Sequence, residues 1–260
     1  MNDAVFGRTA AVGSDTSLAL PTILAVCGQI VVRRSVDLRQ LTANNEIAGF
    51  EFATVGVIFA VIAAFATIVV WEKFAQAENA VAQEAGASAA LYRFAAGPDP
   101  KMKAIREALS NYLRLAIEKE WPAMAKGKKS REVTDALGGL YASVMHLAEG
   151  DTAPAALLNE MFKLADEITH ERRTRLHLAS GGIPAVVWLV VFTAAILTVA
   201  FTFFFGAENL RDQVLMTAFL SLLTFTTVFA ITEIDYPFTG PSHVESHELS
   251  EVLQEFDRKD

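Results

Sequence analysis

The chain holds few side-chain groupings that could do covalent chemistry. The segment 127–130 resembles part of a phosphate-binding loop, but Pro122 stands where the first glycine of that loop is needed. No G-x-S-x-G motif occurs, and Cys27 is the single cysteine. His243 and His247, spaced i, i+4 among glutamates, could hold a metal, but a solvated face of an acidic tail explains them more simply. The sequence therefore predicts no enzyme and no metal or cofactor.

Ion passage is the other chemistry that the residues allow, around the apolar segment 52–71. Glu51 and Glu72 bracket a bulky helical stripe, and carboxylates at the ends of a membrane span avoid lipid unless they reach water. The residues predicted to line a pore are Asn45, Glu46, Glu51, Thr54, Ile58, Ile62 and Phe65.

The opposite face of the same helix leaves a second interpretation open. It carries a seam of small residues that would allow close helix approach, namely Ala53, Gly56, Ala60, Ala63 and Thr67. Bulky residues opposite such a seam most often only face lipid or pack in a bundle. Both interpretations of the stripe, pore lining and packing, therefore remain.

Basic residues just before the third apolar segment predict contact with phospholipid headgroups rather than catalysis. They are His170, Arg172, Arg173 and Arg175. Upstream, Pro122 should end or kink a helix that begins near Lys101, because proline cannot donate to the helix. Trp121 beside it should wedge between helices, with a ligand pocket around Trp121 and Glu120 as the alternative. The residues assigned to structure are Trp71, Trp121, Pro122, Pro184 and Pro237.

Four windows without Asp, Glu, Lys or Arg decide the class of the protein. They cover residues 16–32, 52–71, 176–207 and 213–232. A bilayer core is about 30 Å thick and needs roughly 20 apolar residues of helix, so we predict a multi-pass membrane protein. The formal net charge of −8 argues against a nucleic-acid partner.

The spans divide the chain into four regions of an all-α fold, because no strand-like alternation appears. We expect the first two spans in 1–71, a helical extramembrane domain in 72–182, two more spans in 183–235 and an acidic tail in 236–260. The second span should continue without a break to Phe94, far beyond the bilayer. Both termini should share the side of 72–182, which we assign to the cytoplasm of a plasma or inner membrane.

At this point the chain resembles the family of membrane proteins that carry a bestrophin-like domain. The matching residues begin with Asn44-Asn45-Glu46, Trp71-Glu72, Glu84-Ala85 and Leu91-Tyr92-Arg93. They continue with Tyr112, Glu120-Trp121-Pro122, Arg172-Arg173 with Arg175, Ile183-Pro184 with Trp188, and Pro237-Phe238-Thr239-Gly240. Their order and spacing, over residues 44–240, carry the resemblance.

The resemblance implies kinship with bestrophins, which are homopentameric anion channels with four spans per subunit and a pore lined by the second span. It therefore implies a homo-oligomer, a pentamer by analogy with bestrophins, that passes chloride or another small ion through the lipid bilayer. The compact acidic run of calcium-gated bestrophins is missing here, so calcium gating is not predicted. The alternative function is a non-conducting membrane scaffold whose helical domain binds a partner.

Overall fold

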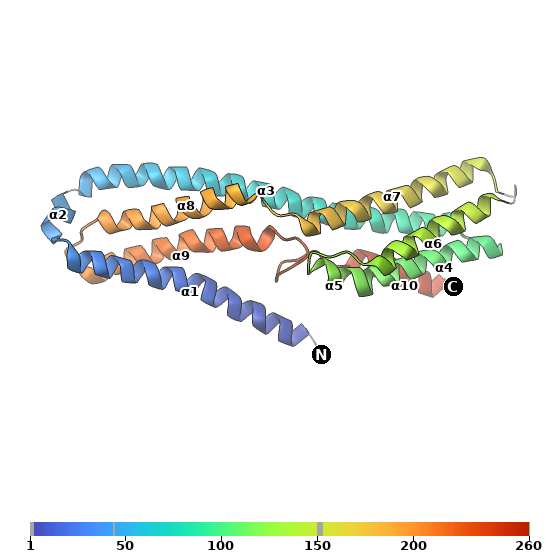
Figure 1. Cartoon of the computed structure of the whole chain (residues 1–260), viewed down its shortest axis with the longest axis horizontal. Coiled ribbons are helices and arrows are strands. Elements are labelled where there is room, and N and C mark those ends of the chain that lie inside the picture. The colour runs from blue at the N-terminus through green and yellow to red at the C-terminus, as the bar shows by residue number, and fades with distance from the viewer. Residues whose placement is uncertain (1–2, 44, 150–152, 260) are drawn as a thin grey trace. The chain divides into compact units, whose positions relative to one another are not determined.

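The computed structural model describes residues 3–43, 45–149 and 153–259, with side chains from residue 18 to residue 258. Helices make up nearly all of these residues, and no strand occurs among them (Figure 1). The prediction of an all-α protein is therefore confirmed. The chain divides into two compact units, which are described separately. The membrane unit comprises Met1–Glu72 and Ile183–Asp235, and the helical unit comprises Lys73–Gly182 and Tyr236–Asp260.

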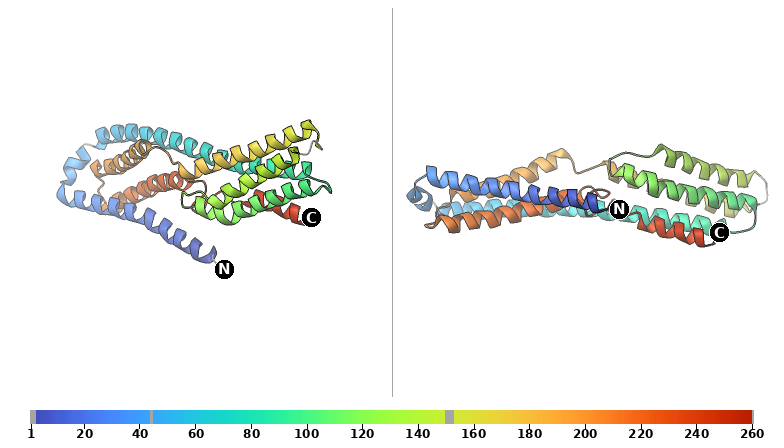
Figure 2. Two further views of the ribbon diagram at one scale, coloured as in Figure 1. Left: turned by 45° about the vertical axis from the view of Figure 1, so that its right-hand side comes forward. Right: turned by 90° about the horizontal axis from the view of Figure 1, so that it is seen from below.

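The membrane unit contains the candidate spans. It holds α1 (Asp3–Ser35), the short α2 (Leu38–Ala43), the first part of α3 (Asn45–Phe94), α8 (Ala185–Phe201), the 3-10 turn η2 (Thr202–Phe204) and α9 (Leu210–Ile234). Four helices among the described residues are long and apolar enough to cross a membrane, in agreement with the four predicted spans. Within this unit α1 lies along α9 (Figure 2).

α3 is one unbroken helix of 50 residues, or about 75 Å at 1.5 Å per residue. The prediction that the second span continues without a break to Phe94 is confirmed. The helix ends at Phe94, and Gly97 follows with φ of +149°, a conformation that favours glycine. Asp99 then caps α4, because its side chain accepts a hydrogen bond from the Lys101 amide at 2.8 Å.

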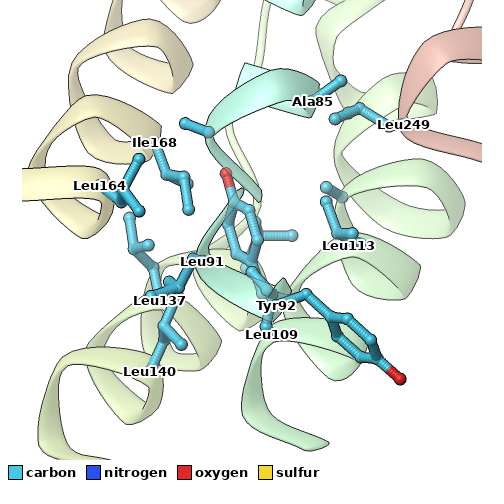
Figure 3. Packing of buried hydrophobic residues seen from close by; sticks show 14 of the residues in the cluster. Ala85, Leu91, Tyr92, Leu109, Leu113, Leu137, Leu140, Leu164, Ile168 and Leu249 are labelled. Carbon is cyan, nitrogen blue, oxygen red and sulfur yellow. The ribbon is translucent and has the colours of Figure 1, made fainter. Parts of the chain in front are cut away.

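The helical unit packs four longer helices with the second part of α3. They are α4 (Pro100–Leu115), α6 (Arg131–Ala148), α7 (Ala155–Ser180) and α10 (His247–Lys259). Figure 3 shows their apolar side chains meeting, with Leu91 from α3, Leu109 from α4, Leu137 from α6, Ile168 from α7 and Leu249 from α10. The predicted packing of the stripes on α4 and α7 against the α3 extension is confirmed.

The helix irregularity near Pro122 begins one turn earlier than the sequence predicts. After α4 the chain forms a π-helical turn, η1 (Ala116–Glu120), and then a short α5 (Trp121–Met124). The Trp121 amide donates to the Ala116 carbonyl five residues back, as in a π turn. Proline therefore widens the preceding turn instead of ending the helix at once, since its missing donor and its ring disturb the turn before it.

Candidate functional site

The predicted pore stripe lies on an exposed face of α3 in the membrane unit. Glu46, Glu51 and Thr54 are exposed in the single chain, and Ile58 and Phe65 are 53% and 67% exposed. Ile62 is half-buried and, with Ile58, borders an apolar groove between α3 and α8. The stripe therefore points away from the core of its own unit, except at Ile62.

Asn45 plays a different part at the start of α3. Its side chain donates to the Gly206 carbonyl at 2.9 Å and accepts from the Gly206 amide at 3.0 Å. A Cβ atom at Gly206 would lie 2.8 Å from the Leu41 Cβ, so the chain approaches too closely there for any side chain. Asn45 thus fixes the loop before α9, and both its side-chain polar atoms are occupied.

The small-residue seam of α3 is mostly unused within the chain. Ala63 is buried and packs with Ala66, Val70 and helices α8 and α9, but Ala53, Ala60 and Thr67 are exposed. A Cβ at Gly56 would find no atom within 4 Å. The face of α3 that packs against α8 and α9 therefore includes little of the seam. Most of the seam is exposed in the single chain and is free for contacts outside it.

Asp235 joins the ends of α8 and α9. Its carboxylate is fully buried and accepts from the Ile183 amide at 3.0 Å and from the Trp188 indole at 3.3 Å. Pro184 is the N-cap residue of α8. A carboxylate at a helix N-terminus is stabilised by the helix dipole, so Asp235 sets where α8 begins.

A buried ion network occupies the centre of the helical unit. Arg175, on α7, donates from Nε to the Glu84 carboxylate at 2.8 Å and from Nη2 to Glu120 at 3.3 Å. Arg172, one turn earlier, contacts Glu120 through two nitrogens at 2.6 and 2.9 Å. Tyr112 donates to Glu84 at 2.6 Å. Glu84, Glu120 and Arg175 are fully buried, so two positive and two negative charges neutralise one another away from water.

Burial and charge set the proton affinities in this network. Burial, and then the Glu84 carboxylate, raise the pKa of Tyr112 well above its ordinary value, so the phenol stays protonated and donates. Burial alone would lower the pKa of Arg175, but the Glu84 carboxylate outweighs it and the pKa is raised. The network therefore holds fixed charges. Its ion pairs connect α3, η1 and α7. None of these groups is poised for acid–base chemistry.

The interpretation of Arg172 and Arg175 as lipid-facing is wrong, because both are buried in the helical unit. Their neighbours His170 and Arg173 are exposed. A signal was present: Arg172 and Arg175 continue the i, i+3, i+4 stripe of Met161, Leu164 and Ile168, which is the core face of α7. Cations on a core face require buried anions, and the sequence provides them in Glu84 and Glu120.

Trp121 covers one side of the network. Its ring lies 4.6 Å from the Arg175 guanidinium and meets Phe238 edge to face at 5.9 Å. The indole donates to the Val244 carbonyl at 3.2 Å, and the Val244 amide donates to the carbonyl of the buried Pro237 at 2.7 Å. Trp121 therefore lies between Arg175 of α7 and the C-terminal segment that contains Phe238 and Val244. Among the other residues assigned to structure, Trp71 and Pro122 are exposed.

Comparison with known proteins identifies the family. The family model for the bestrophin-like domain matches residues 19–249. A crystal structure of a bacterial bestrophin homologue from Klebsiella pneumoniae shares 15% identity with the chain. It has a TM-score of 0.74, and the match covers 92% of this chain and 96% of that one.

A point variant of the Klebsiella pneumoniae homologue gives the same TM-score and identity, covering 95% of this chain and 96% of its own. No match appears among curated protein sequences. At this identity the solved structures show the shared fold, whereas the family model covers most of the chain. The chain belongs to the bestrophin-like domain family of integral membrane proteins.

Proposed function

We propose that copies of this chain assemble into an ion channel whose pore is lined by the first part of α3. The observation that carries the proposal is the exposed stripe of Glu51, Thr54, Ile58 and Phe65. Glu51 and Thr54 are polar side chains on a helix that is long and apolar enough to span a bilayer. An exposed carboxylate there is costly in lipid, and a water-filled pore removes that cost.

Family membership supports assembly around a central axis, because bestrophins are oligomeric channels. The unpacked seam at Gly56 supports it as well, since small residues allow close approach of a helix from another copy. The proposed assembly is a homo-oligomer, and kinship suggests five copies. The helical unit is assigned to the cytoplasmic side.

The ion is proposed to be an anion such as chloride, from kinship. Glu46 and Glu51 oppose this assignment, because rings of carboxylates favour cations. Selectivity is therefore the property that most sharply tests the pore. If Glu51 faces the pore, Glu51→Gln should shift the selectivity toward anions.

The test uses purified full-length protein in planar bilayers, with the reversal potential measured under a potassium chloride gradient. The sign of this potential shows whether potassium or chloride permeates more readily, and Glu51→Gln should move it toward the chloride equilibrium potential. Glu78→Gln, at an exposed position of α3 in the helical unit, is the matched control and should leave it unchanged. Absence of current across pH and voltage, from a confirmed oligomer, would overturn the proposal.

The second candidate is a non-conducting scaffold that binds a partner through the helical unit. Its support is the balanced charge of that region, with 15 Lys and Arg and 15 Asp and Glu between residues 72 and 175. Native mass spectrometry separates the two functions. A ring of about five copies supports a central pore, because bestrophin-type channels form around an axis. A monomer or dimer leaves no central pore and favours the scaffold.

A further inference from the structure

A cavity in the membrane unit remains outside the proposed pore. It has a volume of about 550 Å³ and lies between the start of α3, the loop after η2 and the first turns of α9. Phe52, Phe205, Met216 and Leu220 provide apolar walls, and Gln213 and Thr217 provide polar ones. A volume of this size with few polar groups is typical of small-molecule sites.

Gln213, a residue of the cavity wall, carries an unsatisfied hydrogen-bond acceptor. Its side chain is only 4% exposed, and its Nε2 donates to the Phe205 carbonyl at 2.5 Å. Its Oε1 is buried without a partner. A buried acceptor left without a donor destabilises the protein, so a donor from outside the chain is expected at this position.

A second unsatisfied group lies one hydrogen bond behind the cavity wall. The Thr217 hydroxyl donates to Oε1 of Gln29 at 3.4 Å, and Gln29 is fully buried with no partner for its Nε2. Thr217 also lies 3.4 Å from the Thr202 hydroxyl, which borders the same cavity. Thr217, Thr202 and Gln29 therefore form a connected group of neutral donors and acceptors. Thr202 and Thr217 lie in the cavity wall together with Gln213, and Gln29 lies behind it.

We propose that this cavity binds a single-chain lipid alcohol, with its hydroxyl donating to Gln213 and its chain against the phenylalanine walls. A carboxylate or phosphate group fits poorly, because the unpaired Oε1 of Gln213 is an acceptor and an anion has no proton to donate. Water alone also fits poorly, because an apolar space of this size offers most waters too few polar partners.

Gly49 offers a way to fill the cavity without disturbing the helix. It borders the cavity, and a Cβ at this position would meet only Cε1 of Phe205, at 4.0 Å. A leucine side chain at Gly49 would extend into the proposed binding space. Gly86 lies on the same helix but is exposed in the helical unit, with nothing within 4 Å of its Cβ, so Gly86→Leu is the matched control.

The experiment is photolabelling of the full-length protein in lipid nanodiscs with a decanol derivative that carries a diazirine on its chain. Adducts are expected on the peptides that contain Phe52 and Met216, and excess 1-decanol should suppress them. Decyl methyl ether, which cannot donate, should compete roughly fivefold less well, the effect of one hydrogen bond. Gly49→Leu should abolish these adducts, whereas Gly86→Leu should keep them.

The acceptor is tested separately with Gln213→Leu, which should remove the difference between the alcohol and the ether. Equal competition by both compounds in the wild-type protein would overturn the proposal. So would unchanged labelling in Gly49→Leu at wild-type oligomer size. Labelling confined to other lipid-facing helices would also overturn it, since a cavity covered by a second copy of the chain would give this result. None of these measurements depends on ion conduction.

Discussion

The two units of the molecule treat polar groups differently. In the helical unit, the buried carboxylates of Glu84 and Glu120 both contact the buried Arg175 directly. Among the described residues, the buried side-chain polar atoms without a partner all lie in the membrane unit. They belong to Gln29, Arg33, Gln213, Ser221 and Glu233.

The apolar residues differ in the same way. The helical unit has a continuous core from five helices, whereas the membrane unit buries a small group around Ala63, Val191 and Val228. Many large apolar side chains of the membrane unit are exposed, including Phe50 at 75% and Phe219 at 70%. The helical unit is thus completed by its own chain, whereas the surfaces of the membrane unit require lipid, further copies or ligands.

The largest effect that follows from this comparison is expected at Arg175. Arg175→Met removes the cation and leaves the carboxylates of Glu84 and Glu120 buried with less compensation. Breaking a buried ion pair in this way costs about 3–5 kcal/mol. The thermal unfolding midpoint in detergent, followed by tryptophan fluorescence, should fall sharply.

Arg173→Met is the control for this substitution, because Arg173 is exposed on the same helix. A surface change of this kind should stay within about 0.5 kcal/mol of wild type. Equal midpoints for the two variants would show that the network does not stabilise the helical unit.

Trp121→Ala is expected to have the next largest effect. The substitution removes the edge-to-face contact with Phe238, the bond to Val244 and the ring over Arg175. Truncation of a packed tryptophan should cost about 3 kcal/mol. Expression and thermal stability should therefore fall before any activity changes. A variant as stable as wild type that has lost a function would point to a ligand pocket here instead.

The sequence predicted the elements better than the contacts between them. Charge-free windows predicted the four spans, and the absence of breakers predicted the unbroken α3, because both depend on local composition. The pairing of Glu84 with Arg175 spans 91 positions, and no local rule predicts which distant carboxylate an arginine will meet.

The candidate pore stripe was predicted only as a helix face. Periodicity placed Glu51, Thr54, Ile58 and Phe65 together, and the structure leaves this face exposed. Periodicity could not distinguish a face that meets water from one that meets lipid, since both are exposed in a single chain. The cavity beside Gln213 was missed because its walls come from α3, α9 and the loop between η2 and α9.

Tyr112→Phe should have a moderate effect, since Arg175 still donates to Glu84. Loss of one buried hydrogen bond costs about 1 kcal/mol. The effect should depend on pH, because burial and Glu84 raise the pKa of Tyr112 in the folded state. The stabilisation by Tyr112 is fully present below the pKa of tyrosine in the unfolded chain, about 10. It is lost as the pH rises through the higher pKa of the folded state. The difference in unfolding midpoint between wild type and variant should therefore shrink above pH ~10, and a constant difference would contradict this account.

Glu171→Gln tests the edge of the same network and should have a smaller effect with the opposite sign. Burial raises the pKa of Glu171, with Glu167 and Glu84 acting in the same direction and His170 opposing them. The folded protein therefore favours the protonated acid more than the unfolded chain does. The contribution to stability is present below the unfolded pKa of about 4.3 and is lost as the pH rises through the folded value. At pH 7 the glutamine variant should unfold at a slightly higher temperature than wild type, and near pH 4 the two should coincide. A lower midpoint at pH 7 would indicate that the Glu171 charge is stabilising.

Phe65→Ala tests the membrane unit, where we expect the smallest effect on stability. Phe65 is 67% exposed in the single chain, so its loss leaves no cavity, and the unfolding midpoint should stay within about 0.5 kcal/mol of wild type. If Phe65 lines a pore, however, the smaller side chain widens an apolar constriction, which should increase single-channel conductance because such constrictions exclude water. Val57→Ala, at another exposed position of α3 outside the stripe, should change neither property. A large loss of stability with unchanged conductance would place Phe65 in a packed interface between copies instead of at the pore.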